Sequence, residues 1–193
     1  MASDIVFGIL VGGRGTRMGG VQKALLPAPD GPAGDTLLAR SVRLGRGLGL
    51  EVVLSGQADL GAAAAGVPQI PDTTPPWGPL SGLAALFAYA RGRRVIALAC
   101  DMPFVSAALL ERLLTEAPDA VLLAPRDPQT GKWQPLFARY DSAALAPVLE
   151  RALAAGERSF QALFARVAVA EIALSAEEHA LLRDWDTPAD VAV

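Results

Sequence analysis

Short apolar runs alternate along this chain with longer segments in which apolar residues recur every three or four positions. The runs Ile5–Val11, Leu50–Leu54 and Arg93–Cys100 are continuous enough to predict buried strands. Between them, segments 36–48 and 80–90 have the spacing of helices with one buried face. Because strands alternate with helices, we predict parallel β-α-β units. The expected fold class is therefore α/β, with a mostly parallel sheet in three α/β/α layers.

The same alternation continues in the second half of the chain, and we expect one domain over residues 1–193. The predicted strands there are 120–124, 133–140 and 167–174. The predicted helices are 106–116, 141–155 and 160–164, followed by a terminal helix that begins at Pro188. In sheets of this kind, ligands bind at the carboxyl ends of the strands. We therefore expect the loops after the first strands to form one common site.

Composition narrows the class of protein. Apolar residues make up 52% of the chain and charged residues 19%, which is ample for a packed core. A net charge of −3 argues against a nucleic-acid partner. The first apolar run, about seven residues, is far shorter than the ~18 needed for a membrane span, so no membrane association is expected. The single cysteine, Cys100, excludes an intrachain disulfide and fits a cytoplasmic location.

The first predicted strand is followed by a loop that combines glycines with cationic side chains. Gly12, Gly13 and three further glycines are interleaved with Arg14 and Arg17, and Lys23 follows. Glycine has no Cβ to keep a phosphate away from backbone N–H groups. The chain has fifteen arginines but only two lysines, and one of the two lies here. Since lysine is a compact point charge, this pattern predicts a phosphate-binding loop.

Two familiar phosphate-binding motifs do not fit this loop. A P-loop requires Gly-Lys-Ser/Thr, but Lys23 lies between Gln22 and Ala24. The dinucleotide fingerprint requires a third glycine where Met18 stands, and an acidic residue near the end of the second strand, where Ser55 stands. The loop therefore belongs to another nucleotide-binding design.

The pattern Leu10-Val-Gly-Gly-x-x-x-Arg17-Met-Gly-Gly-Val-x-Lys23 resembles the signature of nucleotidyltransferases that activate sugars and cofactors. It is most similar to that of the molybdenum cofactor guanylyltransferases. Further similar segments follow in order: Pro71-Asp72, Gly78–Gly82, Ala99–Pro103, Gln134–Leu136, Ala155–Arg158 and Asp186–Pro188. The resemblance implies the nucleotide-diphospho-sugar transferase fold, which is Rossmann-like. It also implies a nucleotide-binding half over about 1–103 and an acceptor-binding half over about 104–193.

The activity that this resemblance implies is transfer of GMP from GTP to molybdenum-bound molybdopterin, with release of pyrophosphate. Mg²⁺ is the implied cofactor, held by Asp101, with Asp186 as a second candidate. The implied catalytic residues are Arg17, Lys23 and Asp101. The implied nucleotide-binding residues are Leu10, Val11, Gly12, Gly13, Lys23, Ser55, Asp72 and Asp101. Arg158, Asp184 and Asp186 are candidates for binding the acceptor. A molybdenum-insertion protein and molybdoenzyme chaperones are implied as partners.

Two departures from the family pattern keep alternatives open. Ser55 replaces an asparagine that contacts the nucleotide, and it lacks the paired donor and acceptor of an amide. Asp184 and Asp186 replace the asparagines of Asn-x-Asn-Thr-Pro, and Asp186-Thr-Pro188 is also a good helix start. A CTP-dependent molybdopterin cytidylyltransferase and a sugar-phosphate nucleotidyltransferase are therefore alternatives. A catalytically idle nucleotide-binding module is a third, although Arg17, Lys23 and Asp101 together speak against it.

Overall fold

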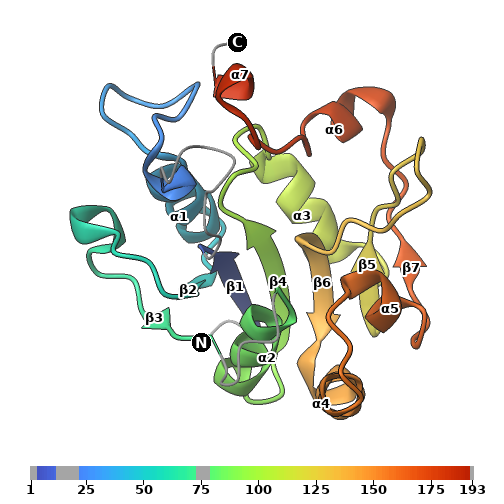
Figure 1. Ribbon diagram of the computed structural model, residues 1–193. Coiled ribbons are helices and arrows are strands. Elements are labelled where there is room, and N and C mark those ends of the chain that lie inside the picture. Colours follow the sequence, from blue (N-terminus) through green and yellow to red (C-terminus); the bar gives the residue numbers. More distant parts are fainter. Residues whose placement is uncertain (1–3, 12–21, 73–78, 192–193) are drawn as a thin grey trace.

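In the computed structural model, which describes residues 4–11, 22–72 and 79–191, helices pack on both faces of one sheet (Figure 1). The sheet has seven strands in the order β3-β2-β1-β4-β6-β5-β7. Their bounds are β1 Ile5–Leu10, β2 Glu51–Ser55, β3 Gln69–Ile70, β4 Arg94–Ala99, β5 Leu122–Ala124, β6 Phe137–Asp141 and β7 Ala170–Glu171. The alternation of strands and helices predicted from the apolar pattern is confirmed.

One strand interrupts an otherwise parallel sheet. β1 pairs in parallel with β2 and β4, β2 with β3, and β5 with β7. β6 is antiparallel to both of its neighbours, β4 and β5. Two reversals restore the original direction, so β5 runs the same way as β4. The carboxyl ends of the six other strands therefore lie at one edge of the sheet.

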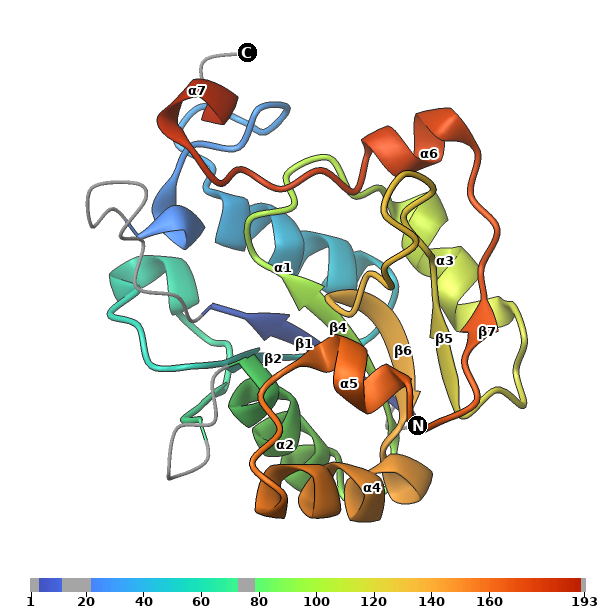
Figure 2. The same ribbon diagram turned by 45° about the vertical axis from the view of Figure 1, so that its right-hand side comes forward.

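The helices divide between the two faces of the sheet (Figure 2). α1 (Leu37–Gly47) and α3 (Ala107–Thr115) cover one face, whereas α2 (Pro79–Ala90), α4 (Ser142–Ala154) and α5 (Phe160–Phe164) cover the other. The short helices are η2 (Lys23–Leu25), η3 (Gly61–Ala64), α6 (Ala176–Ala180) and α7 (Pro188–Val191). Within the described ranges, no helix has both the length and the apolar character that crossing a membrane requires.

Alternate side chains of β1 build two separate cores. Phe7 and Ile9 pack with α1 and α3, whereas Val6 packs with α2 and α4. On the first face, a Cβ atom at Gly45 would lie only 2.4 Å from Phe7 Cδ1 and 2.9 Å from Val52 Cγ2. The glycine therefore allows α1 to approach the sheet more closely than any larger residue would.

Two strands are shorter than the apolar pattern predicted. The last strand covers Ala170–Glu171 rather than 167–174, because it lies at the sheet edge and its one neighbour, β5, has only three residues. β6 begins at Phe137 rather than at 133. Pro135 has no N–H to donate to a ladder, and the N–H of Gln134 turns to the Pro125 carbonyl at 3.0 Å. The predicted strands 133–140 and 167–174 thus pair with the sheet over only part of their length.

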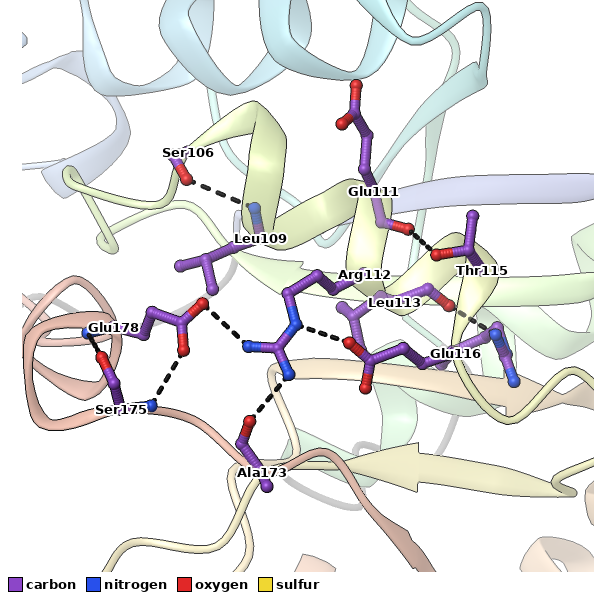
Figure 3. Close-up of polar contacts among 11 residues, drawn as sticks. Ser106, Leu109, Glu111, Arg112, Leu113, Thr115, Glu116, Ala173, Ser175 and Glu178 are labelled. Carbon is purple, nitrogen blue, oxygen red and sulfur yellow. Dashed lines mark hydrogen bonds and ion pairs between the residues drawn. The ribbon is translucent and has the colours of Figure 1, made fainter.

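Arg112 on α3 holds the start of the C-terminal segment, residues 173–191, in place (Figure 3). Its guanidinium donates to Glu178 Oε1 at 2.8 Å, to the Ala173 carbonyl at 2.7 Å and to Glu116 Oε1 at 2.5 Å. Glu178 also accepts from the main-chain N–H of Ser175 at 2.8 Å, which completes a capping box on α6. From this anchor the chain returns across the carboxyl ends of the strands (Figure 2).

Candidate active site

The ends of three parallel strands meet at one edge of the sheet. Leu10, the last residue of β1, lies beside Ser55 on β2 and beside Ala99 on β4. The N–H of Val11 donates to the Ser55 carbonyl at 2.9 Å, and the N–H of Cys100 donates to the Leu10 carbonyl at 3.2 Å. The three strands therefore end side by side, as the predicted parallel sheet requires.

Lys23 brings two distant carboxylates together at this edge. Its Nζ atom lies 2.8 Å from Asp101 Oδ2 and 2.5 Å from Asp186 Oδ1. The side chains of Lys23 and Asp101 are each 19% exposed, whereas that of Asp186 is 45% exposed. One ammonium group thus joins the first loop, the end of β4 and the C-terminal segment.

The charges of this cluster alter two pKa values. Burial lowers the pKa of Lys23, but its hydrogen bonds to Asp101 and Asp186 outweigh burial and leave the pKa above its ordinary value. Burial raises the pKa of Asp184, and the negative charges of Asp186 and Asp101 raise it further. The edge is therefore acidic, and Lys23 is a firmly protonated cation within it.

Trp185 anchors the C-terminal segment beside Asp101. Its main-chain N–H donates to the Asp101 carbonyl at 2.9 Å, and the residue is only 3% exposed. Its ring meets that of Phe104 edge-on, with centroids 6.1 Å apart. Because Asp184 and Asp186 flank this buried anchor, the segment holds both carboxylates at the site edge.

A second group of residues surrounds Gly82 on α2. A Cβ atom at this position would lie 3.1 Å from Leu10 Cδ2, 3.3 Å from Ser55 Oγ and 3.5 Å from Asp72 Oδ1. Burial raises the pKa of Asp72. The Ser55 hydroxyl donates to the Gly82 carbonyl at 3.0 Å, and Ser55 is 1% exposed. Glycine at position 82 thus lets α2 lie close to three of the predicted nucleotide-binding residues.

The predicted site residues fall into three groups. Leu10, Val11, Lys23, Ser55, Asp72, Asp101, Asp184 and Asp186 all lie at or next to the shared strand edge. Gly12, Gly13 and Arg17 lie outside the described residues. Arg158 lies on the exposed turn between α4 and α5, where its Nη1 atom donates to the Glu157 carbonyl at 2.9 Å.

Two neighbours of the carboxylates were not among the predicted site residues. Arg183 directly precedes Asp184, and its Cζ atom lies 4.5 Å from the centroid of the Phe104 ring. Phe104 in turn follows the Asp101-Met-Pro motif by one residue. Their closeness in sequence to two predicted motifs was the signal that could have identified them.

The carboxylates are suited to a hard cation. Among the described residues, no cluster of three or more His, Cys, Asp or Glu side chains has metal-site geometry. Asp101 and Asp186 nevertheless converge on the same positive group, the Lys23 ammonium. Mg²⁺ is commonly held by one or two carboxylates, with substrate phosphates and water completing its coordination. This pair therefore fits a metal that binds together with a phosphorylated substrate.

Solved structures share this architecture. The molybdopterin-guanine dinucleotide biosynthesis protein A from Archaeoglobus fulgidus superposes with a TM-score of 0.76 at 24% identity, covering 97% of this chain and 95% of that one. The 2-C-methyl-D-erythritol 4-phosphate cytidylyltransferase from Thermus thermophilus superposes with a TM-score of 0.67 at 19% identity, covering 96% and 94%. The predicted nucleotide-diphospho-sugar transferase fold is confirmed. These two superpositions establish the fold of this chain.

Sequence comparison identifies the family. The model of the MobA-like NTP transferase domain matches residues 8–174. A molybdenum cofactor guanylyltransferase from Pseudomonas putida (strain GB-1) is 38% identical over 184 residues, which cover 93% of this chain and 92% of that protein. A molybdenum cofactor guanylyltransferase from Serratia proteamaculans (strain 568) is 29% identical over 181 residues, which cover 93% of this chain and 89% of that protein. The chain belongs to the family of MobA-like NTP transferase domains.

Proposed function

We propose that this protein transfers GMP from GTP to molybdenum-bound molybdopterin, forming molybdopterin guanine dinucleotide and pyrophosphate. The observation that carries the proposal is the 38% identity, over nearly the whole chain, to a molybdenum cofactor guanylyltransferase. The site adds chemical support, since Lys23 and Asp101 meet at the carboxyl edge of a nucleotide-binding sheet. The proposed location is the cytoplasm.

The reaction is a displacement at the α-phosphorus of GTP. An oxygen of the acceptor phosphate forms the new P–O bond, the bond to the β-phosphate bridge breaks, and pyrophosphate leaves with the electron pair. A phosphate monoester is already largely ionised at neutral pH, so the acceptor needs no general base. This agrees with a chain whose one histidine, His179, lies on α6. The work of the protein is positioning and charge neutralisation.

We assign these tasks to the groups at the strand edge. The glycine-rich loop with Arg17 would hold the triphosphate through N–H groups and a guanidinium. Lys23 would leave its ion pairs with Asp101 and Asp186 and neutralise charge as it builds on the departing pyrophosphate. Asp72, which lies close to Gly82, would contact the nucleotide.

Asp101 and Asp186 would hold Mg²⁺ once Lys23 turns toward the triphosphate. When bound, such an ion neutralises phosphate oxygens and polarises the phosphorus under attack. The two carboxylates suit it because their oxygens are hard ligands and already converge within hydrogen-bonding distance of one cation. Residues 1–103 would supply most of the nucleotide site, and residues 104–193 the acceptor site.

A specific observation favours CTP as the second candidate nucleotide. Ser55 already donates its hydroxyl hydrogen to the Gly82 carbonyl, so in this conformation it can only accept a hydrogen bond from a base. It therefore cannot offer the guanine base the paired contacts of an amide. If GTP is the substrate, base selection must depend on other groups around Gly82.

Handling of so reactive an acceptor favours transfer between proteins over free diffusion. We propose that a molybdenum-insertion protein delivers the loaded pterin and that molybdoenzyme chaperones receive the dinucleotide. A complex isolated by co-purification with either class would support this hand-over. If the dinucleotide reached its acceptor protein only by diffusing free through the solvent, the proposed hand-over would be contradicted.

The experiment that tests the function measures pyrophosphate release from GTP, CTP, UTP and ATP, each with and without molybdenum-loaded molybdopterin. The proposal expects release from GTP that depends on the pterin and on Mg²⁺. Release from CTP alone would replace it with a cytidylyltransferase. Release with a sugar phosphate in place of the pterin would indicate the sugar-activating class. Nucleotide binding without any release would indicate an idle module.

A further inference from the structure

Arg183 lies over an aromatic ring at the border of the candidate active site. Its Cζ atom is 4.5 Å from the centroid of Phe104, a residue that follows the Asp101-Met-Pro motif. Phe104 packs edge-on against Trp185, with an angle of 79° between the ring planes. We call Arg183, Phe104 and Trp185 the arginine platform. It connects the loop after β4 with the C-terminal segment.

The base of the platform is fixed. Trp185 is 3% exposed, and its main-chain N–H donates to the Asp101 carbonyl at 2.9 Å. The ring quadrupole attracts a cation above its face, which favours the conformer of Arg183 that lies over Phe104. A guanidinium held over a ring in this way can still donate hydrogen bonds from its N–H groups.

These donors have no partner within the part of the chain that the structure describes. Several other arginines of the described ranges pair with carboxylates: Arg40 with Asp30, Arg93 with Glu51, and Arg112 with Glu116 and Glu178. Arg183 is exposed and makes no such hydrogen bond or ion pair there, although an aspartate follows it directly. The ring thus supports a cation whose hydrogen-bonding capacity is not used by the described residues.

The negative charge around the site indicates a function for the Arg183 guanidinium. Asp101, Asp184 and Asp186 gather at the strand edge, and Lys23 pairs with only two of them. A phosphate monoester with a charge of about −1.5 to −2 would be repelled by such an edge. A guanidinium at the border of this edge offsets part of the negative charge and can bind two phosphate oxygens at once.

We infer that Arg183, supported by Phe104, binds the phosphate group of the acceptor. The inference rests on the proposed function, because the phosphate it concerns is the attacking one. It adds to that function a substrate-binding residue on the acceptor side. The nucleotide-binding groups around Gly82 have no part in it.

Steady-state kinetics of Arg183→Ala test the inference. The KM for molybdenum-loaded molybdopterin should rise by about tenfold to a hundredfold, the worth of a charge-assisted hydrogen bond. The KM for GTP, and kcat at saturating acceptor, should stay within about twofold of wild type. Arg183→Lys should recover part of the loss, because it restores the charge without the planar fork.

Two further variants make the test specific. Phe104→Leu removes the ring but keeps an apolar side chain, and should raise the same KM by a smaller factor. Arg91→Ala is the matched control, because Arg91 is exposed and lies just before β4, at the opposite edge of the sheet. It removes the same charge and should leave both KM values unchanged. Equal thermal unfolding of all variants shows that folding is intact.

The outcomes separate the inference from the function on which it rests. Wild-type transfer with an unchanged acceptor KM in Arg183→Ala overturns the inference alone. An equal rise in Arg91→Ala also overturns it, since the effect would then be one of net charge. Failure of the wild-type enzyme to transfer GMP to molybdopterin overturns both.

Discussion

At the scale of single residues, the central observation is that one lysine serves two carboxylates. Lys23 contacts Asp101 and Asp186, which are 78 and 163 residues away in sequence. Each residue was singled out from the motifs, but their joint contact depends on the fold. Ser55 shows the same limit: its replacement of an amide is visible in the sequence, whereas its hydrogen bond to the Gly82 carbonyl is not.

The role of Asp101 predicts a large effect of a small change. Asp101→Asn keeps the size of the side chain but removes its charge, so kcat should fall by at least about a hundredfold. The fold should survive, because the bond to Trp185 uses the Asp101 carbonyl of the main chain. Asp119→Asn, on the exposed turn before β5, is the matched control. Undiminished turnover by Asp101→Asn would show that the Asp101 carboxylate is not the metal ligand.

A second residue-scale prediction concerns pH and stability. The hydrogen bonds from Arg93 and Tyr89 hold the pKa of Glu51 below its ordinary value. A carboxylate with a lowered pKa in the folded state stabilises the protein above its unfolded-state pKa. That stability is lost as pH falls through the folded-state pKa. Glu51→Gln should therefore lower the free energy of unfolding at neutral pH by about 1 kcal/mol or less, because the pair is partly exposed.

Denaturant unfolding across a pH series checks this prediction. The difference between wild type and Glu51→Gln should shrink toward zero as the solution becomes acidic enough to protonate Glu51. Glu150→Gln, on the exposed side of α4, should show no such trend. A difference between wild type and Glu51→Gln that stays constant over the whole series would disprove the electrostatic explanation.

At the scale of elements, the contact of α1 with the sheet depends on glycine at one position. Gly45 faces Phe7 and Val52, whereas a Cβ atom at Gly47 would have nothing within 4 Å. Gly45→Ala should destabilise the fold by about 1–3 kcal/mol through overpacking. Gly47→Ala should be neutral or stabilise it by up to about 1 kcal/mol through helix propensity. Thermal or denaturant unfolding measures both, and equal effects would contradict the packing argument.

The apolar pattern predicted most elements, because helix caps and buried strands are local features. Thr36, Ser106 and Asp141 cap α1, α3 and α4 through their side chains. A side-chain oxygen just before a segment with helical apolar spacing is the usual sign of a helix start. Ladder lengths were less predictable. β7 was expected over eight residues and has two, since its length depends on how much of β5 is available to pair with it.

At the scale of the whole molecule, the topology converts separate motifs into one site. Parallel pairing of β1 with β2 and β4 aligns three strand ends, and the C-terminal segment crosses that edge through Trp185. The shared edge was predictable, because parallel strands place their carboxyl ends together. The arginine platform was less predictable, because Arg183 and Phe104 stand next to predicted motifs in the sequence but come into contact only through the fold.

The most direct test of the account follows the fate of the phosphates. The enzyme would be given GTP labelled at either the α- or the γ-phosphate, together with molybdenum-loaded molybdopterin and Mg²⁺. The account predicts that the α-label enters the pterin product and that the γ-label leaves in pyrophosphate. A γ-label released as inorganic phosphate, with no α-label in the pterin, would contradict it.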